Sequence, residues 1–337
     1  MSRLASSPII RHSAEVSTAI VNIFAEHCIP ALTPDKYKGQ CGRIGVMGGS
    51  ETYVGAPFYA GNAALKGGAD LVYLFTAEEA VLPIKTFSPE LMVEPSYRCI
   101  NTGPEQSPQV IAESVVAKLG RLHSLCIGPG LGRHQHVFAG VKEVIRAARG
   151  TSTPLVIDAD GLFLVTQDIR IIQGNQNVVL TPNIVEFMRL CKVFNVDVPP
   201  LPYSLHLPDW CSSVETLATL LGNVTVVLKG EKDILSNGLE TCVVHETGGL
   251  RRSGGQGDVL AGIMTLACAW SAIAPKLPDS SEMSSVLLAA GVFASTVTKR
   301  VSRISYNEHG RSMGVPDMFS KIGPVIEAIA PAPKVEI

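Results

Sequence analysis

The chain has 337 residues, of which 46% are hydrophobic and 17% charged, and its formal net charge is −2. This composition provides enough apolar material for a large core and excludes an intrinsically disordered chain. The near balance of charge gives no single-sign field to attract nucleic acid or an anionic membrane. We therefore expect small-molecule partners, no nucleic acid and no membrane.

The eight cysteines show no C-x-x-C spacing and no clustering with histidine along the sequence. This pattern predicts neither disulfides nor a zinc site and is typical of a reducing compartment. The histidines agree, because His123, His134, His136 and His245 are not paired at metal-ligand spacing and fit surface or core positions.

Residues 1–14 contain two arginines, several serines and no acid, and we expect a flexible N-terminus there. The segment permits mitochondrial targeting, but it lacks a helical apolar period and a secretory core, so the cytoplasm is the default location. Residues 15–328 are expected to form one domain, since no linker or repeat divides them, and residues 329–337 a tail. The sequence permits a homo-oligomer without requiring one.

Short runs rich in Val, Ile and Leu predict buried strands, and the segments with helical spacing between them predict helices. The strands are expected at residues 43–47, 71–75, 125–127, 155–157, 178–180 and 224–228, and helices include residues 56–66, 136–148 and 184–192. This alternation predicts a mostly parallel sheet with helices on both faces.

The later part of the chain departs from this alternation. The Pro-rich residues 198–208 predict a surface loop. Residues 234–236 and 241–245 flank Asn237-Gly238 and predict an antiparallel hairpin at the edge of the sheet. The apolar residues 259–275 are too short and interrupted for a bilayer span, so we expect a buried helix.

A glycine-rich loop, residues 254–258, directly precedes this helix and ends in Asp258. Glycines let backbone N–H groups turn toward a ligand, and a helix N-terminus attracts anions, so the loop could hold a phosphoryl group. Asp258 could then accept a proton from a hydroxyl that attacks phosphorus. A simple helix cap explains the same residues equally well. No Walker motif and no protein-kinase glycine loop is present.

Polar residues also follow the other predicted strands, where ligands bind in parallel sheets. Asn183 and Glu186 could orient hydrated Mg²⁺, although a capping box is the more economical interpretation of their spacing. Asp158 and Asp160 pose the same choice between a ligand and a turn former. Lys229 begins a charged turn that could meet a phosphate.

Together, in this order, these segments resemble the ribokinase-like NAD(P)H-hydrate dehydratases, and more specifically their separate eukaryotic type. The resemblance covers about residues 36–325. It is carried by residues 42–50 (GRIGVMGGS), 53–57 (YVGAP), 60–72 (AGNAALKGGADLV), 128–132 (GPGLG), 156–162 (VIDADGL), 180–183 (LTPN) with Glu186-Phe187, 229–230 (KG) and 254–258 (GGQGD).

The resemblance implies a three-layer α/β/α fold, Mg²⁺ as cofactor, ATP as co-substrate and a separate epimerase as a functional partner. It implies that Asp258 is the catalytic base and that Gly255, Gln256 and Gly257 form the anion hole. The implied nucleotide site is Lys229, Gly230, Glu231, Lys232, Asp233, Gly248, Gly249, Leu250, Arg251, Arg252, Ser253, Gly254, Gly255, Gln256 and Gly257. The implied substrate site is Gly130, Asn183, Ile184, Val185, Glu186, Phe187, Met188, Arg189 and Asp258. Asn183 and Glu186 match the metal-linked Asn-x-x-Glu element.

The implied activity is removal of water from hydrated NADH and NADPH, through phosphorylation of the C6 hydroxyl and elimination. Two positions depart from many relatives, which have Thr in place of Gln256 and Gly in place of Asp70. One alternative is a kinase of the same fold that acts on a hydroxymethylpyrimidine or a thiazole alcohol. A nucleotide-binding regulator without catalysis is a second.

Overall fold

The computed structural model describes residues 9–11, 13–100, 106–274 and 285–332. Within these residues one ten-stranded sheet has the order β1-β10-β9-β8-β7-β6-β5-β2-β3-β4. The strands are β1 (Ile9–Arg11), β2 (Arg43–Met47), β3 (Leu71–Ala77), β4 (Met92–Tyr97), β5 (Ser124–Ile127), β6 (Leu155–Ile157), β7 (Val178–Leu180), β8 (Thr225–Leu228), β9 (Asp233–Ser236) and β10 (Glu240–Val244).

The sheet is parallel from β8 to β4, and β9 is antiparallel to both β8 and β10. The chain builds outward from the centre in two directions, since β2 leads to β3 and β4, whereas β5 leads toward β8. The order therefore reverses between β2 and β5. In such sheets this switch point, at the carboxyl ends of the strands, opens a crevice where ligands bind.

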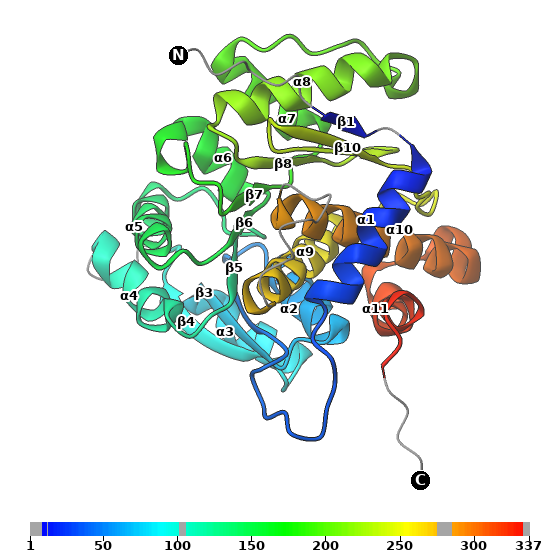
Figure 1. Ribbon diagram of the computed structural model, residues 1–337. Helices are drawn as coiled ribbons and strands as arrows, with labels where there is room; N and C mark the ends of the chain where they lie inside the picture. Colours follow the sequence, from blue (N-terminus) through cyan, green and yellow to red (C-terminus); the bar gives the residue numbers. More distant parts are fainter. Residues whose placement is uncertain (1–8, 12, 101–105, 275–284, 333–337) are drawn as a thin grey trace.

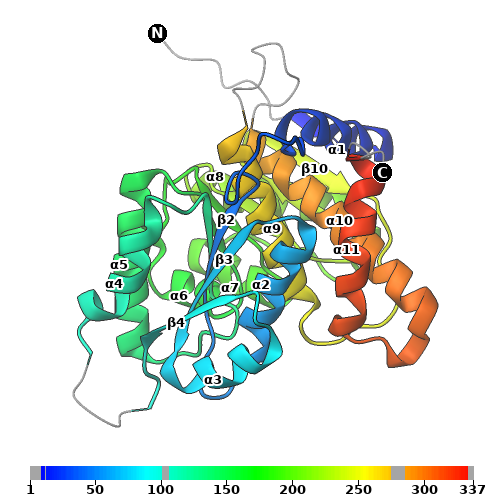
Figure 2. The same cartoon turned by 90° about the horizontal axis from the view of Figure 1, so that it is seen from below.

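Helices cover both faces of the sheet, as Figures 1 and 2 show. One face carries α1, α2, α9, α10 and α11, and the other carries α4 to α8. The helices are α1 (Ala14–Cys28), α2 (Gly55–Gly67), α3 (Glu78–Phe87), α4 (Pro108–Leu119), α5 (Gln135–Thr151), α6 (Asp160–Gln167), α7 (Ile184–Phe194), α8 (Leu207–Leu220), α9 (Gln256–Ile273), α10 (Val286–His309) and α11 (Val315–Ile329).

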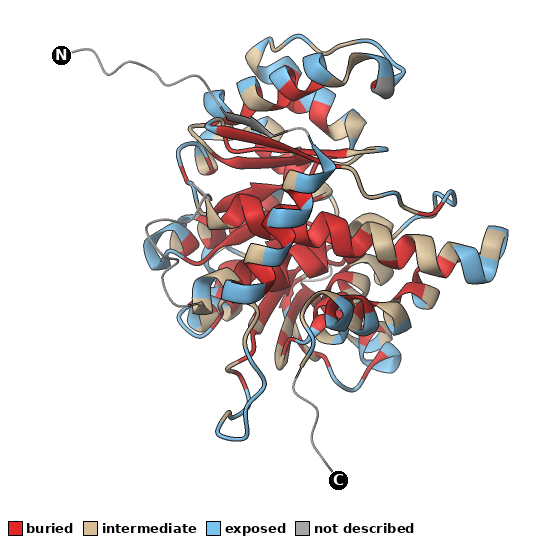
Figure 3. Ribbon diagram, turned by 45° about the vertical axis from the view of Figure 1, so that its right-hand side comes forward, coloured by how far each residue is buried: buried red, intermediate tan, exposed pale blue. Residues whose placement is uncertain are grey.

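Helix α9 lies at the centre of the core, and Figure 3 shows buried residues gathered in the sheet and the helices against it. Every residue from Val259 to Trp270 is buried. By length and composition α9 could cross a membrane, but 67% of it is buried within the protein, as expected for a core helix. The predicted buried helix is confirmed.

The three-layer α/β/α fold is confirmed, and two strands were not predicted. Strand β1 pairs with β10, outside the predicted hairpin. Ile9–Arg11 lies within the segment expected to be flexible and forms this edge strand, while residues 1–8 and 12 lie outside the described residues. Strand β4 contains Pro95, which removes an N–H donor and argues against a strand; its edge position tolerates the loss.

The structure also describes the Pro-rich segment and the end of the last helix. The Pro-rich segment is mainly a loop, but it contains a 3-10 turn at Tyr203–His206, and Tyr203 is buried against Trp210. Helix α11 ends at Ile329, and residues 333–337 of the expected tail lie outside the described part. All eight cysteines are buried, and none of them forms a disulfide within the described residues.

Candidate active site

The N-terminus of α9 is open to an anion. Its N-cap is Gly255, in the left-handed region at φ +92°, and no side chain caps the helix. A Cβ at this position would lie 2.7 Å from the Tyr59 ring, so only glycine fits the turn. Since the first N–H groups of a helix lack partners within the helix, they remain free to bind a phosphoryl group. Asp258 lies on this same turn.

Four charged side chains meet beside this turn, each from a different loop or helix end. The Lys229 ammonium, after β8, lies 2.7 Å from Asp158 Oδ1, after β6. A Cβ on Gly257 would lie 3.3 Å from Lys229 Nζ, so this ion pair touches the backbone of the glycine-rich loop. Asp258 and Glu186 of α7 complete the group, because both interact electrostatically with Asp158 and Lys229.

Burial and the surrounding charges raise the pKa of two carboxyl groups in this cluster, those of Asp258 and Glu186. Burial, together with Asp158 and Glu186, raises the pKa of Asp258 to about 8, although Lys229 opposes the shift. Burial also raises the pKa of Glu186. Burial disfavours the charge on Lys229, but the carboxylates outweigh it and raise the pKa of the ammonium. Perturbed carboxyl groups in a crevice are typical of a reactive centre.

The surplus of negative charge fits a divalent cation. Three carboxyl groups, those of Asp158, Glu186 and Asp258, surround the single ammonium of Lys229. Oxygen donors of this kind suit Mg²⁺, which needs few protein ligands because it keeps several waters. A cation would relieve the repulsion that raises the pKa of Asp258.

Asn183 forms the capping box with Glu186 that their spacing indicated. Its side-chain oxygen accepts hydrogen bonds from the N–H groups of Val185 and Glu186, both at 3.0 Å. One Glu186 oxygen accepts from the Asn183 N–H at 2.8 Å, which completes a capping box. Asn183 therefore serves the helix, and the same capping box holds the Glu186 carboxylate in place.

Helix α10 contacts both segments expected to bind nucleotide, residues 229–233 and 248–257. Lys299 Nζ donates to the carbonyls of Gly230 and Glu231 at 2.9 and 3.1 Å and lies 3.1 Å from Asp233 Oδ1. The carboxylate of Asp233 also accepts from the Gly230 N–H at 3.0 Å. One turn further along α10, Ser302 accepts from the Gly249 N–H at 3.3 Å.

Gln256 organises the loop that precedes α9. Its amide nitrogen donates to the Arg251 carbonyl and the Ser253 hydroxyl, both at 3.0 Å, and its oxygen accepts from Ser302 at 3.3 Å. A threonine at this position would be too short for these contacts. The other departure, Asp70, has a similar role, since its carboxylate accepts from Gly39 and Cys41 at 2.7 and 2.8 Å.

The loop that contains Gly130 is held in a conformation that requires glycine. Gly128 has φ +122°, and a Cβ there would lie 1.9 Å from the Asp158 carbonyl oxygen. The Asp160 carboxylate accepts from the Gly132 N–H at 3.1 Å and from Arg133 Nε at 2.9 Å. Asp158 therefore faces the reactive cluster, whereas Asp160 fixes the glycine loop.

The expected substrate segment, residues 183–189, contains both buried and exposed side chains. The Phe187 side chain is fully buried against Trp210, so a ligand contact at this position would involve its backbone. Val185 and Met188 are about half exposed, at 52% and 50%. Arg189 and Glu186 line a small cavity together with Arg133, beside the glycine loop.

Three residues in this region escaped the sequence analysis. Lys299 contacts a turn almost 70 residues away, which no local pattern signals. The Tyr203 hydroxyl is buried near Gly230 and has no hydrogen-bond partner among the described residues. Arg133 follows the glycine loop directly and stacks over Phe163 at 4.1 Å. Its position next to a recognised motif was the signal that could have identified it.

Known proteins resemble this chain over most of its length. A sequence model described as NAD(P)H-hydrate dehydratase matches residues 44–324. The ATP-dependent (S)-NAD(P)H-hydrate dehydratase of Rattus norvegicus is 41% identical over 314 residues, which cover 93% of this chain and 87% of that protein. The Homo sapiens protein with the same name is 42% identical over 295 residues, 88% of this chain and 80% of that one.

Solved structures agree on the fold. The ADP/ATP-dependent NAD(P)H-hydrate dehydratase from Bacillus subtilis, co-crystallised with ATP and Mg²⁺, superposes with a TM-score of 0.63 at 18% identity, over 96% of this chain and 99% of that one. The hydroxyethylthiazole kinase from Pyrococcus horikoshii gives a TM-score of 0.58 at 13% identity, over 94% and 95%. A dehydratase and a kinase thus share this architecture, so the fold alone does not separate the two activities.

Proposed function

The chain belongs to the NAD(P)H-hydrate dehydratase family, and from that premise we propose that it converts hydrated NADH and NADPH to NADH and NADPH, with ATP as co-substrate. The observation that carries the proposal is the position of Asp258, on the first turn of an uncapped helix and beside the Lys229–Asp158 pair. This arrangement places a base next to an anion site, as phosphoryl transfer to a hydroxyl requires.

The reaction begins at the C6 hydroxyl of the hydrated nicotinamide ring, which is a poor leaving group. Asp258 accepts the hydroxyl proton as the oxygen attacks the γ-phosphorus of ATP, and ADP departs. The backbone N–H groups of Gly255 to Gly257 stabilise the charge on the migrating phosphoryl group. The ring nitrogen then expels the C6 phosphate as its electron pair forms a C=N bond. Loss of a C5 proton gives the dihydronicotinamide.

Charge controls when Asp258 can act. Its raised pKa keeps the carboxyl largely protonated at neutral pH in the ligand-free protein. Lys229 favours the ionised form, and a further cation would strengthen that effect. The Lys229 ammonium is therefore positioned to favour the ionised base.

We propose Mg²⁺ as that cation, held by Glu186 and Asp158 directly or through water. Bound Mg²⁺ supplies neutralisation of phosphate charge in phosphoryl transfer. Asn183 would position Glu186 through the capping box rather than coordinate the ion.

The names of the relatives specify the (S) form of the hydrate. An enzyme limited to one epimer leaves the other unrepaired, so we propose that a separate epimerase supplies the substrate. The cytoplasm is the proposed location.

The decisive experiment follows the dihydronicotinamide absorbance after purified protein is mixed with hydrated NADH and Mg²⁺. ATP and ADP are supplied separately, and the absorbance should return with ATP and yield ADP and phosphate. Release of a stable phosphorylated alcohol in place of NADH would favour the kinase alternative. ATP consumption without substrate-dependent turnover would favour the regulator.

A further inference from the structure

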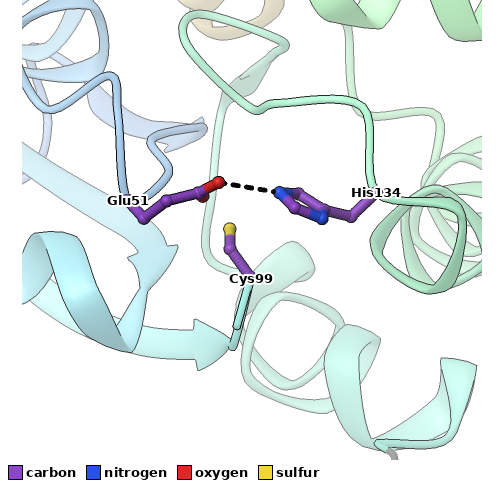
Figure 4. A group of neighbouring side chains, drawn as sticks. All are labelled: Glu51, Cys99 and His134. Atoms are coloured by element: carbon purple, nitrogen blue, oxygen red, sulfur yellow. Dashed lines mark hydrogen bonds and ion pairs between the residues drawn. The ribbon is translucent and has the colours of Figure 1, made fainter. Parts of the chain in front are cut away.

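A second group of potential ligands lies on the same edge of the sheet, apart from the cluster at Asp258. It consists of Glu51, Cys99 and His134. Glu51 lies in the loop between β2 and α2, Cys99 follows β4, and His134 is the N-cap of α5. Figure 4 shows the carboxylate, the thiol and the imidazole pointing toward one another. The proposed dehydration uses none of these side chains.

The spacing of the donor atoms suits one metal ion. The carboxylate oxygen, the thiol sulfur and the imidazole nitrogen all lie within 4.8 Å of one another. Glu51 Oε1 and His134 Nε2 are 3.2 Å apart. Tetrahedral Zn²⁺ with bonds of about 2.0 to 2.3 Å places its donors roughly 3.3 to 3.8 Å apart. Side-chain movements of about 1 Å would therefore complete the coordination.

Burial and chemistry identify the kind of ion. Cys99 is buried, whereas the side chains of Glu51 and His134 are each 33% exposed, so the group opens to solvent on one side. Mg²⁺ prefers an all-oxygen set of ligands, while sulfur and nitrogen donors favour Zn²⁺. We propose that Glu51, Cys99 and His134 bind one Zn²⁺ ion, with water in the fourth position.

The surrounding contacts hold the donors in place. The N–H groups of Cys99 and Ile100 donate to the Glu79 carboxylate at 3.1 and 2.9 Å. The Tyr97 hydroxyl donates to the Gly49 carbonyl at 2.7 Å, which ties β4 to the loop that contains Glu51. Supporting contacts of this kind orient metal ligands and contribute to affinity.

Binding requires one proton to leave. Burial and the neighbouring Glu51 raise the pKa of the Cys99 thiol to about 12. The ion therefore replaces the thiol proton, which passes to solvent, and the bound sulfur is a thiolate. Glu51 and His134 coordinate through a carboxylate oxygen and an imidazole nitrogen.

The ion would also join two loops at the switch point. His134 lies two residues after Gly132, where a Cβ would be 3.3 Å from both the His134 ring and Ser50. A metal held by Glu51 and His134 would thus cross-link the loop after β2 to the loop that contains Gly130. The site goes beyond dehydration and does not depend on it.

Metal titration of the full-length, chelator-treated protein tests the proposal. Zn²⁺ should bind at one equivalent in excess Mg²⁺, and Co²⁺ should give a thiolate-to-cobalt charge-transfer band. Cys99→Ser should abolish the band, and Cys99→Ser and His134→Ala should each weaken Zn²⁺ binding at least about 100-fold. Zn²⁺ should raise the melting temperature of the wild type but not of Cys99→Ser.

Two controls separate this site from its surroundings. Cys28→Ser also replaces a buried cysteine, but on α1, and should keep the band and the affinity. Glu186→Gln alters the carboxylates near Asp258 and should likewise keep the band. The proposal is overturned if the wild type shows no charge-transfer band, or if folded Cys99→Ser binds Zn²⁺ as tightly as the wild type. Far-ultraviolet circular dichroism establishes that each variant is folded.

Discussion

Replacing Asp258 by Asn should strongly reduce catalysis and stabilise the protein at the same time. The two side chains have nearly the same shape, so the substitution removes the charge and the proton-accepting oxygen without creating a cavity. Loss of the base should reduce kcat/KM by about 10²- to 10⁴-fold. In the wild type, kcat/KM should rise with pH through about 8, where Asp258 ionises in the free protein.

The stability effect follows from the same raised pKa. The folded protein retains the Asp258 proton up to about pH 8, whereas the unfolded chain releases it near pH 3.8. Between these values the unfolded state binds fewer protons, so wild-type stability falls as pH rises. Asparagine has no proton to lose. The gain in Asp258→Asn should therefore be absent near pH 4 and grow until about pH 8.

The pKa of Asp258 sets an upper limit on the gain in the free energy of unfolding. A difference of about four pH units corresponds to roughly 5 to 6 kcal/mol at ~1.4 kcal/mol per unit. Asp258 is only partly buried and its neighbours can rearrange, so solvent screening should reduce the effect to about 1 to 3 kcal/mol.

Urea unfolding of both proteins between pH 4.5 and 8.5 measures this difference, with Asp197→Asn as the control at an exposed carboxyl group. A gain of equal size at pH 4.5 and 8.5 would refute the reasoning, as would an Asp258→Asn protein less stable than the wild type at pH 8.5.

Three further substitutions test other parts of the site. Lys299→Ala removes charge-assisted hydrogen bonds and should raise the KM for ATP about tenfold, with little change in the KM for hydrated NADH. The control Lys321→Ala, in a surface ion pair, should change neither constant. Steady-state kinetics measures both constants, and an equal change in the two would contradict this expectation. Gly128→Ala forces a Cβ to within 1.9 Å of a carbonyl oxygen and should lower the free energy of unfolding by at least about 3 kcal/mol. The control Gly150→Ala, with open space around it, should be neutral or slightly stabilising; urea unfolding measures both variants. Lys229→Met leaves buried carboxylates without their ammonium and should lower the free energy of unfolding by about 3 kcal/mol at pH 7 and by less in acid. A loss of stability that does not depend on pH would argue against an electrostatic cause.

Local patterns were sufficient to predict the central strands of the sheet. Each predicted central strand is a short apolar run between turn residues, and these runs are buried on both faces in the structure. Strand β4 escaped because Pro95 contradicts the pattern, and only the edge position, which is a tertiary property, tolerates it. The burial of the Phe187 side chain could not be predicted for a different reason. A resemblance transfers positions in a motif but not the direction of a side chain, and Phe187 shares its helix face with Leu190 and Cys191, which are buried with it.

Contacts between distant segments were beyond any local pattern. Lys299 reaches the turn after β8 only because α10 packs across that end of the sheet. Glu51, Cys99 and His134 are separated by 83 residues from first to last, so the search for closely spaced ligands predicted no metal site there. Their assembly depends on the strand order, which places the ends of β2, β4 and β5 on the same edge.

Helix α9 begins at the anion site and continues as the most enclosed helix of the core, with every residue from Val259 to Trp270 buried. The reactive turn is continuous with this buried helix, so we expect its position to depend on the packing of the interior. Heat inactivation and global melting should consequently occur together, without a warm, folded but inactive intermediate. Inherited substitutions deep in α9 would then reduce activity mainly by lowering the amount of folded enzyme, and a stabilising ligand should rescue them.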